Sequence, residues 1–346
     1  MEIITPAQYE EYEQFVQNHP SGSFMQSVNW AKVKNNWKHE VVIHRDGSGA
    51  ITGGMSILIM PMGAGAMMYA PRGPVCDYTD RDTLADLLEG AKKVGEKYHA
   101  HILKMDPYII LGEEHESEKI ALFRSLGCTI TENAGFKDTI QPRYNYMLPY
   151  IKDKTPEELL ACFSRDTRYY IRYPQKKGVV CKNTGLEGLD DFYSIYAKTG
   201  ERQGFNVRPK EYLARFLTAF PDSVARLYMC YFEDTPLCGG IAMQYAGKTA
   251  HVYGCSSDEM RNLRPTYLLQ WALMNWALEG GCWVYDMQGI AIHKEDSEAL
   301  YNVWGFKQNF TGEVVTTVGE FELVLRPGYN KAMDLAMKAR KALKKH

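Results

Sequence analysis

Residues 163–178 concentrate positive charge and aromatic rings in a chain that is otherwise nearly neutral. The segment reads FSRDTRYYIRYPQKKG, whereas the 346 residues together carry a formal net charge of −2. Cationic side chains bind phosphates and aromatic rings stack on unpaired bases, so this composition indicates an RNA-binding surface. Most of the cations recur every three or four residues, which aligns them on one helix face. The predicted RNA contacts are Arg165, Arg168, Arg172, Lys176 and Lys177. The alternative is a solvated helix that only keeps the protein in solution.

Metal and thiol chemistry find little support in the sequence. The eight cysteines lie far apart, no C-x-x-C motif is present, and the nine histidines are scattered. We therefore predict reduced core thiols in a cytoplasmic protein, with no metal site and no covalent enzyme intermediate. There is no apolar run long enough to span a membrane, and the acidic start MEIITPAQYEEYEQF does not resemble a signal peptide.

Two amphipathic segments predict the helices that position the rest of the chain. Residues 81–98 and 264–281 each repeat apolar side chains at helical spacing. Each is preceded by paired strand-like segments and followed by a short apolar strand that stops at an acid, and then by another helix. These segments are 50–62, 67–75, 99–107 and 118–128 in the first half, and 225–247, 248–256, 282–289 and 297–306 in the second. The order of elements thus occurs twice, which predicts two α+β domains of one type. The predicted boundaries are 1–150 plus 322–346 for the first domain and 151–321 for the second.

This order of elements is that of N-acyltransferases whose sheet separates to admit an acyl carrier. Enzymes that use coenzyme A bind its pyrophosphate on a glycine-rich turn before the helix that follows the central strands. The corresponding segments here, DYTDRDTL (77–84) and SSDEMRNLRPTY (256–267), contain no glycine. An acyl-CoA-dependent N-acyltransferase stays open as an alternative, although these segments lack the glycine-rich turn that would bind coenzyme A.

Eight short stretches, in order along nearly the whole chain, carry a resemblance to a known family. They are QSVNWAKVKNNW (26–37), KMDP (104–107), TIQPR (139–143), TRYYIRYPQKKGV (167–179), RPKEYL (208–213), YGCSS (253–257), YDMQGI (285–290) and FKQNF (306–310). In these stretches the chain resembles the FemABX aminoacyltransferases, and their short FemX type in particular. The resemblance implies two acetyltransferase-like (GNAT-type) domains, here without the coiled-coil arm of larger members.

The resemblance also implies an activity. The family transfers an amino acid from aminoacyl-tRNA to the stem peptide of a peptidoglycan precursor, either UDP-MurNAc-pentapeptide or its lipid-linked form. No cofactor is expected, and an armless member is expected to be a monomer. A non-catalytic RNA-binding module is the other alternative.

The family's acceptor site implies roles for five residues of this chain. Lys34 and Arg208 match cations that bind the acceptor's diphosphate, which Arg can contact through two oxygens at once. Tyr212 and Tyr253 match tyrosines that line the site. His101 stands where the short type has a tyrosine, so its role is open between proton transfer and simple packing.

Three further matches concern the chemical step. Asp106 matches the acid that faces the acceptor amine, where it orients the amine or accepts its proton. Phe306 and Lys307 match the family's Phe-Lys pair, and we expect Lys307 to stabilise the oxyanion formed when the ester is attacked. Asp286 and Gly289 are expected to shape the neighbouring turn.

The final segment, YNKAMDLAMKARKALKKH (329–346), predicts a basic amphipathic helix. Such a helix binds RNA or the anionic inner face of the membrane. The alternative, which we favour, is a helix that packs on the first domain and ends in a frayed basic tail.

Overall fold

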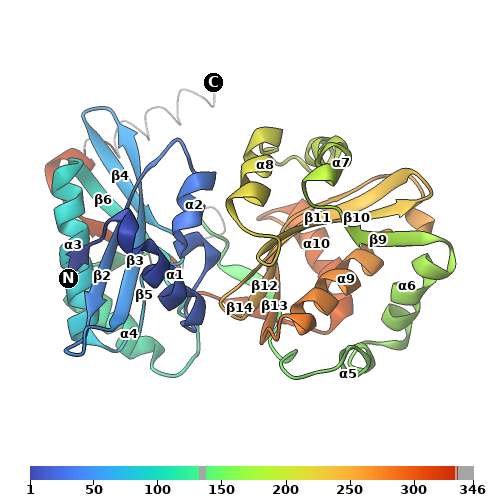
Figure 1. Ribbon diagram of the computed structural model, residues 1–346, viewed down its shortest axis with the longest axis horizontal. Helices are drawn as coiled ribbons and strands as arrows, with labels where there is room; N and C mark the ends of the chain where they lie inside the picture. Colours follow the sequence, from blue (N-terminus) through green and yellow to red (C-terminus); the bar gives the residue numbers. More distant parts are fainter. Residues whose placement is uncertain (132–137, 332, 334–346) are drawn as a thin grey trace. The chain divides into compact units, whose positions relative to one another are not determined.

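The computed structural model describes residues 1–131, 138–331 and 333. The chain divides into two compact units (Figure 1). The first unit comprises Met1–Gln141 and Thr317–His346, and the second comprises Pro142–Thr316. These boundaries differ from the predicted ones, because residues 142–150 belong to the second unit and residues 317–321 to the first.

The first unit is built on one mixed sheet with the strand order β1-β2-β3-β4-β6-β15-β7, and β5 pairs with β3. Neighbouring strands are antiparallel except β4 and β6, which are parallel. The strands are β1 (Glu2–Ile3), β2 (Lys38–Arg45), β3 (Ile51–Met62), β4 (Gly65–Ala70), β5 (Val75–Cys76), β6 (Ala100–Met105), β7 (Thr129–Ile130) and β15 (Phe321–Val324). The helices are α1 (Tyr9–Asn18), α2 (Val28–Val33), α3 (Arg81–Lys97) and α4 (Glu116–Ser125), with short 3₁₀ turns at Pro6–Gln8 and Phe24–Gln26.

Helix α3 shows how the sequence fixes the main helix of this unit. Asp80 accepts hydrogen bonds from the backbone N–H groups of Asp82 and Thr83, which caps the first turn. Leu84, Leu87 and other apolar side chains at helical spacing are buried against the sheet. The helix predicted at 81–98 is therefore confirmed, as is the strand that follows it.

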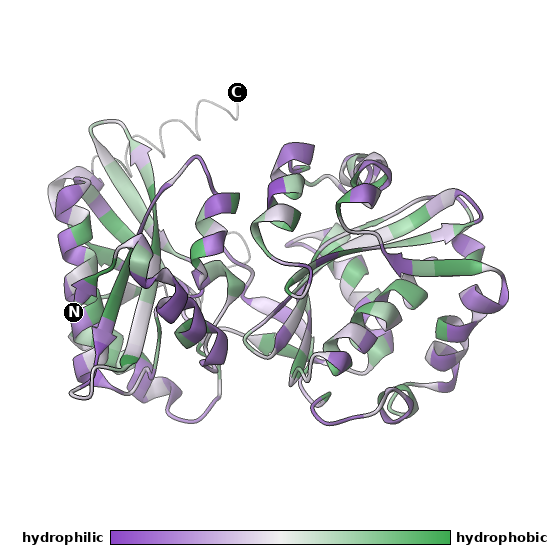
Figure 2. Cartoon of the chain, viewed as in Figure 1, coloured by the Kyte–Doolittle hydropathy of each residue, from purple (hydrophilic) through white to green (hydrophobic). Residues whose placement is uncertain are grey.

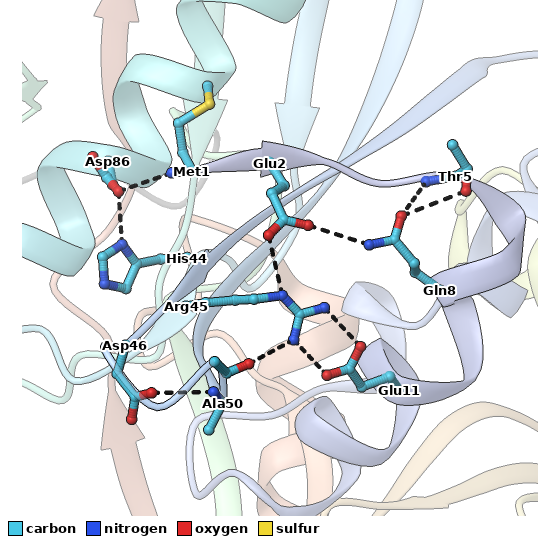
Figure 3. A network of polar contacts seen from close by, with 11 residues as sticks. Met1, Glu2, Thr5, Gln8, Glu11, His44, Arg45, Asp46, Ala50 and Asp86 are labelled. Atoms are coloured by element: carbon cyan, nitrogen blue, oxygen red, sulfur yellow. Dashed lines mark hydrogen bonds and ion pairs between the residues drawn. The ribbon is translucent and has the colours of Figure 1, made fainter.

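A polar network holds the N-terminal segment on strand β2 (Figure 3). The Arg45 guanidinium donates to both carboxylate oxygens of Glu11, at 2.5 and 2.7 Å, and to Glu2 Oε1 at 3.2 Å. Asp86 of α3 accepts from the Met1 amine at 3.1 Å and contacts His44 Nδ1 at 2.7 Å. Strand β1 and helix α1 are thus tied to β2 and α3 by charge as well as by packing.

The second unit has a seven-stranded sheet with the order β14-β8-β13-β12-β11-β10-β9. Its strands are β8 (Tyr144–Leu148), β9 (Val179–Asn183), β10 (Ala225–Phe232), β11 (Thr235–Tyr245), β12 (Lys248–Ser256), β13 (Val284–Gly289) and β14 (Glu313–Thr316). Its helices are α5 (Pro156–Ala161), α6 (Arg165–Lys176), α7 (Leu189–Gln203), α8 (Lys210–Ala219), α9 (Pro265–Glu279) and α10 (Glu298–Lys307), with 3₁₀ turns at Gly185–Gly188, Arg261–Leu263 and Gln308–Phe310. Helices α7 and α9 both contact the central strands β11 and β12.

Two central strands of the second sheet pair over only part of their length. Strands β12 and β13 are parallel, and their register runs from Lys248 opposite Val284 to Ala250 opposite Asp286. Beyond that point β12 carries a bulge, because Ala242 of β11 pairs with His251 while Ile241 pairs with Tyr253. The strands therefore separate at a defined position, next to the end of β13.

Burial follows the pattern expected from the sequence. In Figure 2 the hydrophobic colour follows the central strands of each unit, whereas α6 is largely hydrophilic. Six of the eight cysteines are buried, while Cys162 is exposed and Cys181 partly so. Among the described residues no helix is longer than the 17 residues of α3, and none combines the length and apolarity needed to cross a membrane. The predicted basic helix at 329–346 lies almost wholly outside the described residues.

Candidate functional site

The predicted site residues are divided between the two units. Lys34, His101 and Asp106 belong to the first unit. The second unit holds the predicted acceptor residues Arg208, Tyr212 and Tyr253, the Phe306–Lys307 pair, and the five cations of α6.

Lys307, the last residue of α10, is a buried ammonium fixed by backbone oxygens. Its side chain is 7% exposed, and Nζ donates to the carbonyls of Gln288 and Gly289, each at 2.9 Å. Burial lowers the pKa of Lys307 to about 8, although the charge of Asp286 opposes this shift. An ammonium has three N–H donors, so two carbonyl bonds leave one donor for a substrate oxygen.

The turn that supplies these carbonyls is held by Asp286. Its Oδ1 accepts from the backbone N–H of Gln288 and its Oδ2 from the Gln288 side-chain amide, both at 2.6 Å. Gln288 adopts a left-handed backbone with φ 65°. The geometry agrees with the expectation that Asp286 shapes this turn, and the turn presents two carbonyl oxygens to one cation.

Phe306 belongs to an aromatic cluster at the start of α9. Its ring centroid lies 5.2 Å from that of Tyr267 and 5.5 Å from that of Phe310. Tyr170 of α6 contacts the same Tyr267 at 5.2 Å, and the Arg264 guanidinium lies 4.8 Å above the Tyr170 ring. The cluster therefore joins α6, α9 and the end of α10 next to Lys307.

Three residues predicted from the sequence meet on the α8 side of the second sheet. The Tyr253 hydroxyl lies 3.5 Å from that of Tyr212, and their rings are perpendicular. The Arg208 guanidinium lies 5.4 Å from the Tyr212 ring centroid. Burial raises the pKa of both tyrosines, so both hydroxyls keep their protons at neutral pH. This group offers one cation and two hydroxyls to a ligand.

Asp106 follows strand β6 and is only 4% exposed. Its Oδ1 accepts from the backbone N–H of Arg72 at 2.9 Å, and its Oδ2 lies 3.6 Å from the Arg72 guanidinium. Burial raises the pKa of Asp106 to about 6, while the charge and N–H of Arg72 and the hydroxyl of Tyr69 favour the carboxylate. Asp106 is thus a stronger base than an exposed aspartate.

Lys34 and His101 differ in how accessible they are. Lys34 caps the C-terminus of α2, and its Nζ lies 5.0 Å from the Trp30 ring centroid. The neighbouring Lys32 instead donates to Asn29 Oδ1 at 2.7 Å. His101 is 2% exposed, and its ring packs 5.5 Å from that of Tyr329. This leaves little of the His101 side chain for a substrate to contact.

Helix α6 forms as predicted and gathers most of its cations at one hollow. Ser164 caps it by accepting from the Thr167 backbone N–H at 3.1 Å. A hollow of about 270 Å³, which we call the basic hollow, is lined by Arg165, Arg168, Tyr169, Arg172, Tyr173 and Lys176. Lys177 is not in this lining and lies with its Nζ 5.6 Å from the Tyr173 ring centroid. Four cations thus surround two tyrosine rings, and Tyr169 is 56% exposed.

Two features of the site were missed from the sequence. One is Arg72, whose only sequence signal is its place between two prolines in the turn PRGP. The other is a buried hydrogen-bond chain in which the Tyr285 hydroxyl donates to Gln270 Oε1 at 2.6 Å and Gln270 Nε2 contacts His251 Nδ1 at 3.0 Å. Burial, and then the charge of Lys307, lower the pKa of His251 to about 4. The imidazole is therefore neutral where β12 and β13 separate.

No metal site emerges from the residues that the structure describes, since no three His, Cys, Asp or Glu side chains are grouped suitably. The candidate residues of the second unit are mainly cations and tyrosine hydroxyls. Such a set binds anions and stabilises developing negative charge.

Each unit has one parallel strand pair in an otherwise antiparallel sheet, with helices packed on it, and this arrangement is the acetyltransferase-like (GNAT) fold. A tandem GNAT protein from the clavulanic acid biosynthesis pathway has a TM-score of 0.52, at 11% identity over 92% of this chain and 95% of that chain. That likeness concerns the fold alone. The prediction of two such α+β domains is confirmed.

The sequence matches the model of the FemAB family over residues 7–233 and 230–338, and the chain belongs to this family. It is 32% identical over 335 residues to the UDP-N-acetylmuramoylpentapeptide-lysine N(6)-alanyltransferase of Weissella viridescens, covering 94% of this chain and 96% of that protein. It is 26% identical over 390 residues to the lipid II:glycine glycyltransferase of Staphylococcus haemolyticus, covering 91% of each. The crystal structure of FemX has a TM-score of 0.86 at 25% identity, over 96% of this chain and 99% of that one. The predicted family is confirmed.

Proposed function

We propose that this protein is an aminoacyltransferase that moves an amino acid from aminoacyl-tRNA to the stem-peptide amine of a peptidoglycan precursor. The acceptor is UDP-MurNAc-pentapeptide or its lipid-linked form. The observation that carries the proposal is the buried Lys307 ammonium, fixed by two carbonyls where β12 and β13 separate. The family match and the two named relatives, an alanyltransferase and a glycyltransferase, support it.

Lys307 acts on the acyl carbonyl. The acceptor amine attacks the aminoacyl ester, a C–N bond forms, the ester C–O bond breaks, and the RNA oxygen leaves as a hydroxyl carrying the proton that the amine has lost. Negative charge develops on the carbonyl oxygen, and the remaining N–H donor of Lys307 stabilises it. Loss of one such donor typically slows a reaction by about 10²–10³-fold. Phe306 helps to position Lys307, because it packs the end of α10 against Tyr267 and Phe310.

The acceptor is bound through its phosphates and its amine. Arg208 binds a phosphate, with the hydroxyls of Tyr212 and Tyr253 beside it. Lys34 of the first unit is the second proposed phosphate ligand. Asp106 orients the amine and accepts its proton, a task for which a pKa of about 6 suits it better than an ordinary aspartate.

The donor is bound through helix α6. The basic hollow offers four cations to phosphates and two tyrosine rings to unpaired bases. Aminoacyl-tRNA is a cytoplasmic substrate, so we place the reaction in the cytoplasm, with the protein acting as a monomer. His101 and Lys177, which the sequence also suggested, have no role in this scheme that a contact supports.

A transfer assay tests the proposal directly. The protein is mixed with charged tRNA and UDP-MurNAc-pentapeptide, and the product is weighed by mass spectrometry. We expect the acceptor to gain the mass of one amino acid residue. In the same assay Lys307→Met should lower kcat by about 10²–10³-fold and leave the acceptor KM nearly unchanged. A raised KM with normal kcat would remove Lys307 from the chemical step. Transfer from acetyl-CoA instead of tRNA would favour the coenzyme A alternative.

A further inference from the structure

A second hollow lies next to the basic hollow, along the adjacent face of α6. It is a groove of about 700 Å³ between α5, α6 and α9, and we call it the α5–α6–α9 groove. Its lining includes Lys154, Arg172, Gln175, Trp271, Asn275 and Leu278. Arg172 lines both this groove and the basic hollow, so the two hollows adjoin each other at this side chain.

The floor of the groove combines an aromatic ring with an unmatched polar atom. Trp271 is partly buried, and its ring is nearly perpendicular to that of Phe163, with the two centroids 6.4 Å apart. Asn275 Oδ1 is buried and has no hydrogen-bond partner among the residues that the structure describes. A buried acceptor without a donor destabilises the folded protein. An N–H donor on a ligand would remove this cost.

We propose that the α5–α6–α9 groove binds one unstacked base from the single-stranded end of the RNA held by α6. Trp271 stacks on the base, the Asn275 side chain turns so that its Oδ1 accepts from the exocyclic amine, and Arg172 contacts the adjoining phosphate. Adenine and cytosine carry such an amine, whereas uracil does not. The inference rests on the proposed function, because the RNA is the aminoacyl donor.

Charge favours RNA over a peptide as the occupant. The rim of the groove carries Lys154 and Arg172 but also Glu157 and Glu279, so the groove alone is nearly neutral. The basic hollow beside it has four cations and no acid in its lining. A ligand that spans both hollows must therefore pair a polyanionic backbone with a flat, largely apolar group, and a single-stranded nucleotide has this form.

The length of α9 sets which base can enter. Tyr267, in the first turn of α9, contacts Phe306 beside Lys307. Asn275 is eight residues further along the helix, which corresponds to about 12 Å at about 1.5 Å per residue. Stacked nucleotides advance about 3.4 Å each along a strand, so no more than three or four span this distance. Because unstacked nucleotides are spaced more widely, the base in the groove should lie within about four positions of the aminoacylated 3′ end.

Fluorescence anisotropy with two RNA hairpins tests the inference. One hairpin has a single-stranded 3′ extension of adenines and cytosines, and the other is blunt. We expect Trp271→Ala to weaken binding of the extended hairpin by about 5- to 150-fold, the effect of losing one stacked base, and to leave the blunt hairpin unchanged. Asn275→Leu should weaken the extended hairpin but not one extended with uracils. Trp271→Phe keeps an aromatic ring and should bind nearly as the unmodified protein, and melting temperatures check that each variant is folded.

A charge variant shows whether a negative result contradicts the base site in the groove or the proposed use of an RNA donor. The pair Arg165→Ala and Lys176→Ala should weaken both hairpins alike, because it removes phosphate contacts from the basic hollow only. If this pair does so while Trp271→Ala and Asn275→Leu leave the extended hairpin unaffected, the groove is not a base site and the RNA donor stands. If Trp271→Ala lowers the affinity for both hairpins equally, the groove is likewise not a base site. If the unmodified protein binds neither hairpin, the RNA donor itself is wrong.

Discussion

At the scale of single residues, the protonation of Lys307 should limit activity on the alkaline side. Its pKa is about 8, so the charged form is lost as pH rises through this value. The acceptor amine changes in the opposite direction, because deprotonation makes it nucleophilic. We expect kcat to fall above pH 8 in the unmodified protein but not in Lys307→Arg, since Arg keeps its charge throughout this range. Measuring kcat between pH 6 and 10 decides this. An alkaline fall at the same pH in both proteins would assign it to another group.

Asp106 should make the protein less stable as pH rises from 4 to 6. Its pKa is raised from 3.8 to about 6 in the folded state. The folded state therefore binds the proton more tightly than the unfolded state does. The stabilisation is complete below pH 3.8 and is lost as pH rises through 6. This rise in the pKa of Asp106 corresponds to about 3 kcal/mol of free energy of unfolding.

The substitution Asp106→Asn removes this titration. The free energy of unfolding of the variant, relative to the unmodified protein, should rise by up to about 3 kcal/mol between pH 4 and pH 7. Urea unfolding at several pH values measures the difference. A flat or falling difference would mean that Arg72 holds the carboxyl at or below its ordinary pKa.

The residues found from the sequence and those missed differ in one physical respect. Arg208, Tyr212 and Tyr253 stand in short stretches that carry the family pattern, and the fold brings them together. Arg72 and the His251–Gln270 pair depend on contacts across strands or between a strand and a helix. No local spacing encodes such contacts, because each needs the strand register and the helix position at once.

At the scale of elements, the position of the His251 ring of β12 depends on small residues beside it. A Cβ atom at Gly240 of β11 would lie 2.7 Å from His251 Nε2, and one at Gly254 would lie 2.9 Å from the same atom. The ring cannot turn away freely because Gln270 contacts its Nδ1. The two glycines thus make room for an imidazole that faces α9.

The substitution Gly240→Ala should therefore destabilise the protein by about 1–3 kcal/mol through overpacking. Adding His251→Ala should recover part of this loss, so the two effects should not add. Urea unfolding of the single and double variants measures the coupling, and Gly47→Ala is a matched control because no atom lies within 4 Å of its new Cβ. Simple additivity would show that the ring and the glycine are independent.

Whether a segment forms a helix or a strand was predictable where the apolar pattern is local. Which strands pair with one another was not predictable. The helices α3, α9 and α10 and the strands β3, β6, β12 and β13 follow from apolar spacing and glycine or proline ends. The position of β8 between β13 and β14 did not follow, and this moved the unit boundary to residue 142. Strand partners here are more than a hundred residues apart in sequence, which no short window can detect.

At the scale of the whole molecule, the two units should differ in whether they fold alone. Every strand of the second sheet comes from residues 142–316, so a protein of these residues should unfold cooperatively in urea. Residues 1–141 lack β15, which pairs with β6 and β7 and buries Phe321 and Leu323. That fragment should be largely unfolded or aggregated by circular dichroism and size-exclusion chromatography. A stable, monomeric 1–141 fragment would show that β15 is dispensable.

The position of strand β15 also determines which unit can complete its sheet first during synthesis. The strand lies between β6 and β7, yet the ribosome makes it only after all of the second unit. The first unit must therefore wait for β15, with the edge of β6 open to wrong partners, while the second unit is made and folds. We expect the yield of active protein to depend on the translation rate across residues 142–316 and on chaperones that shield an open sheet edge.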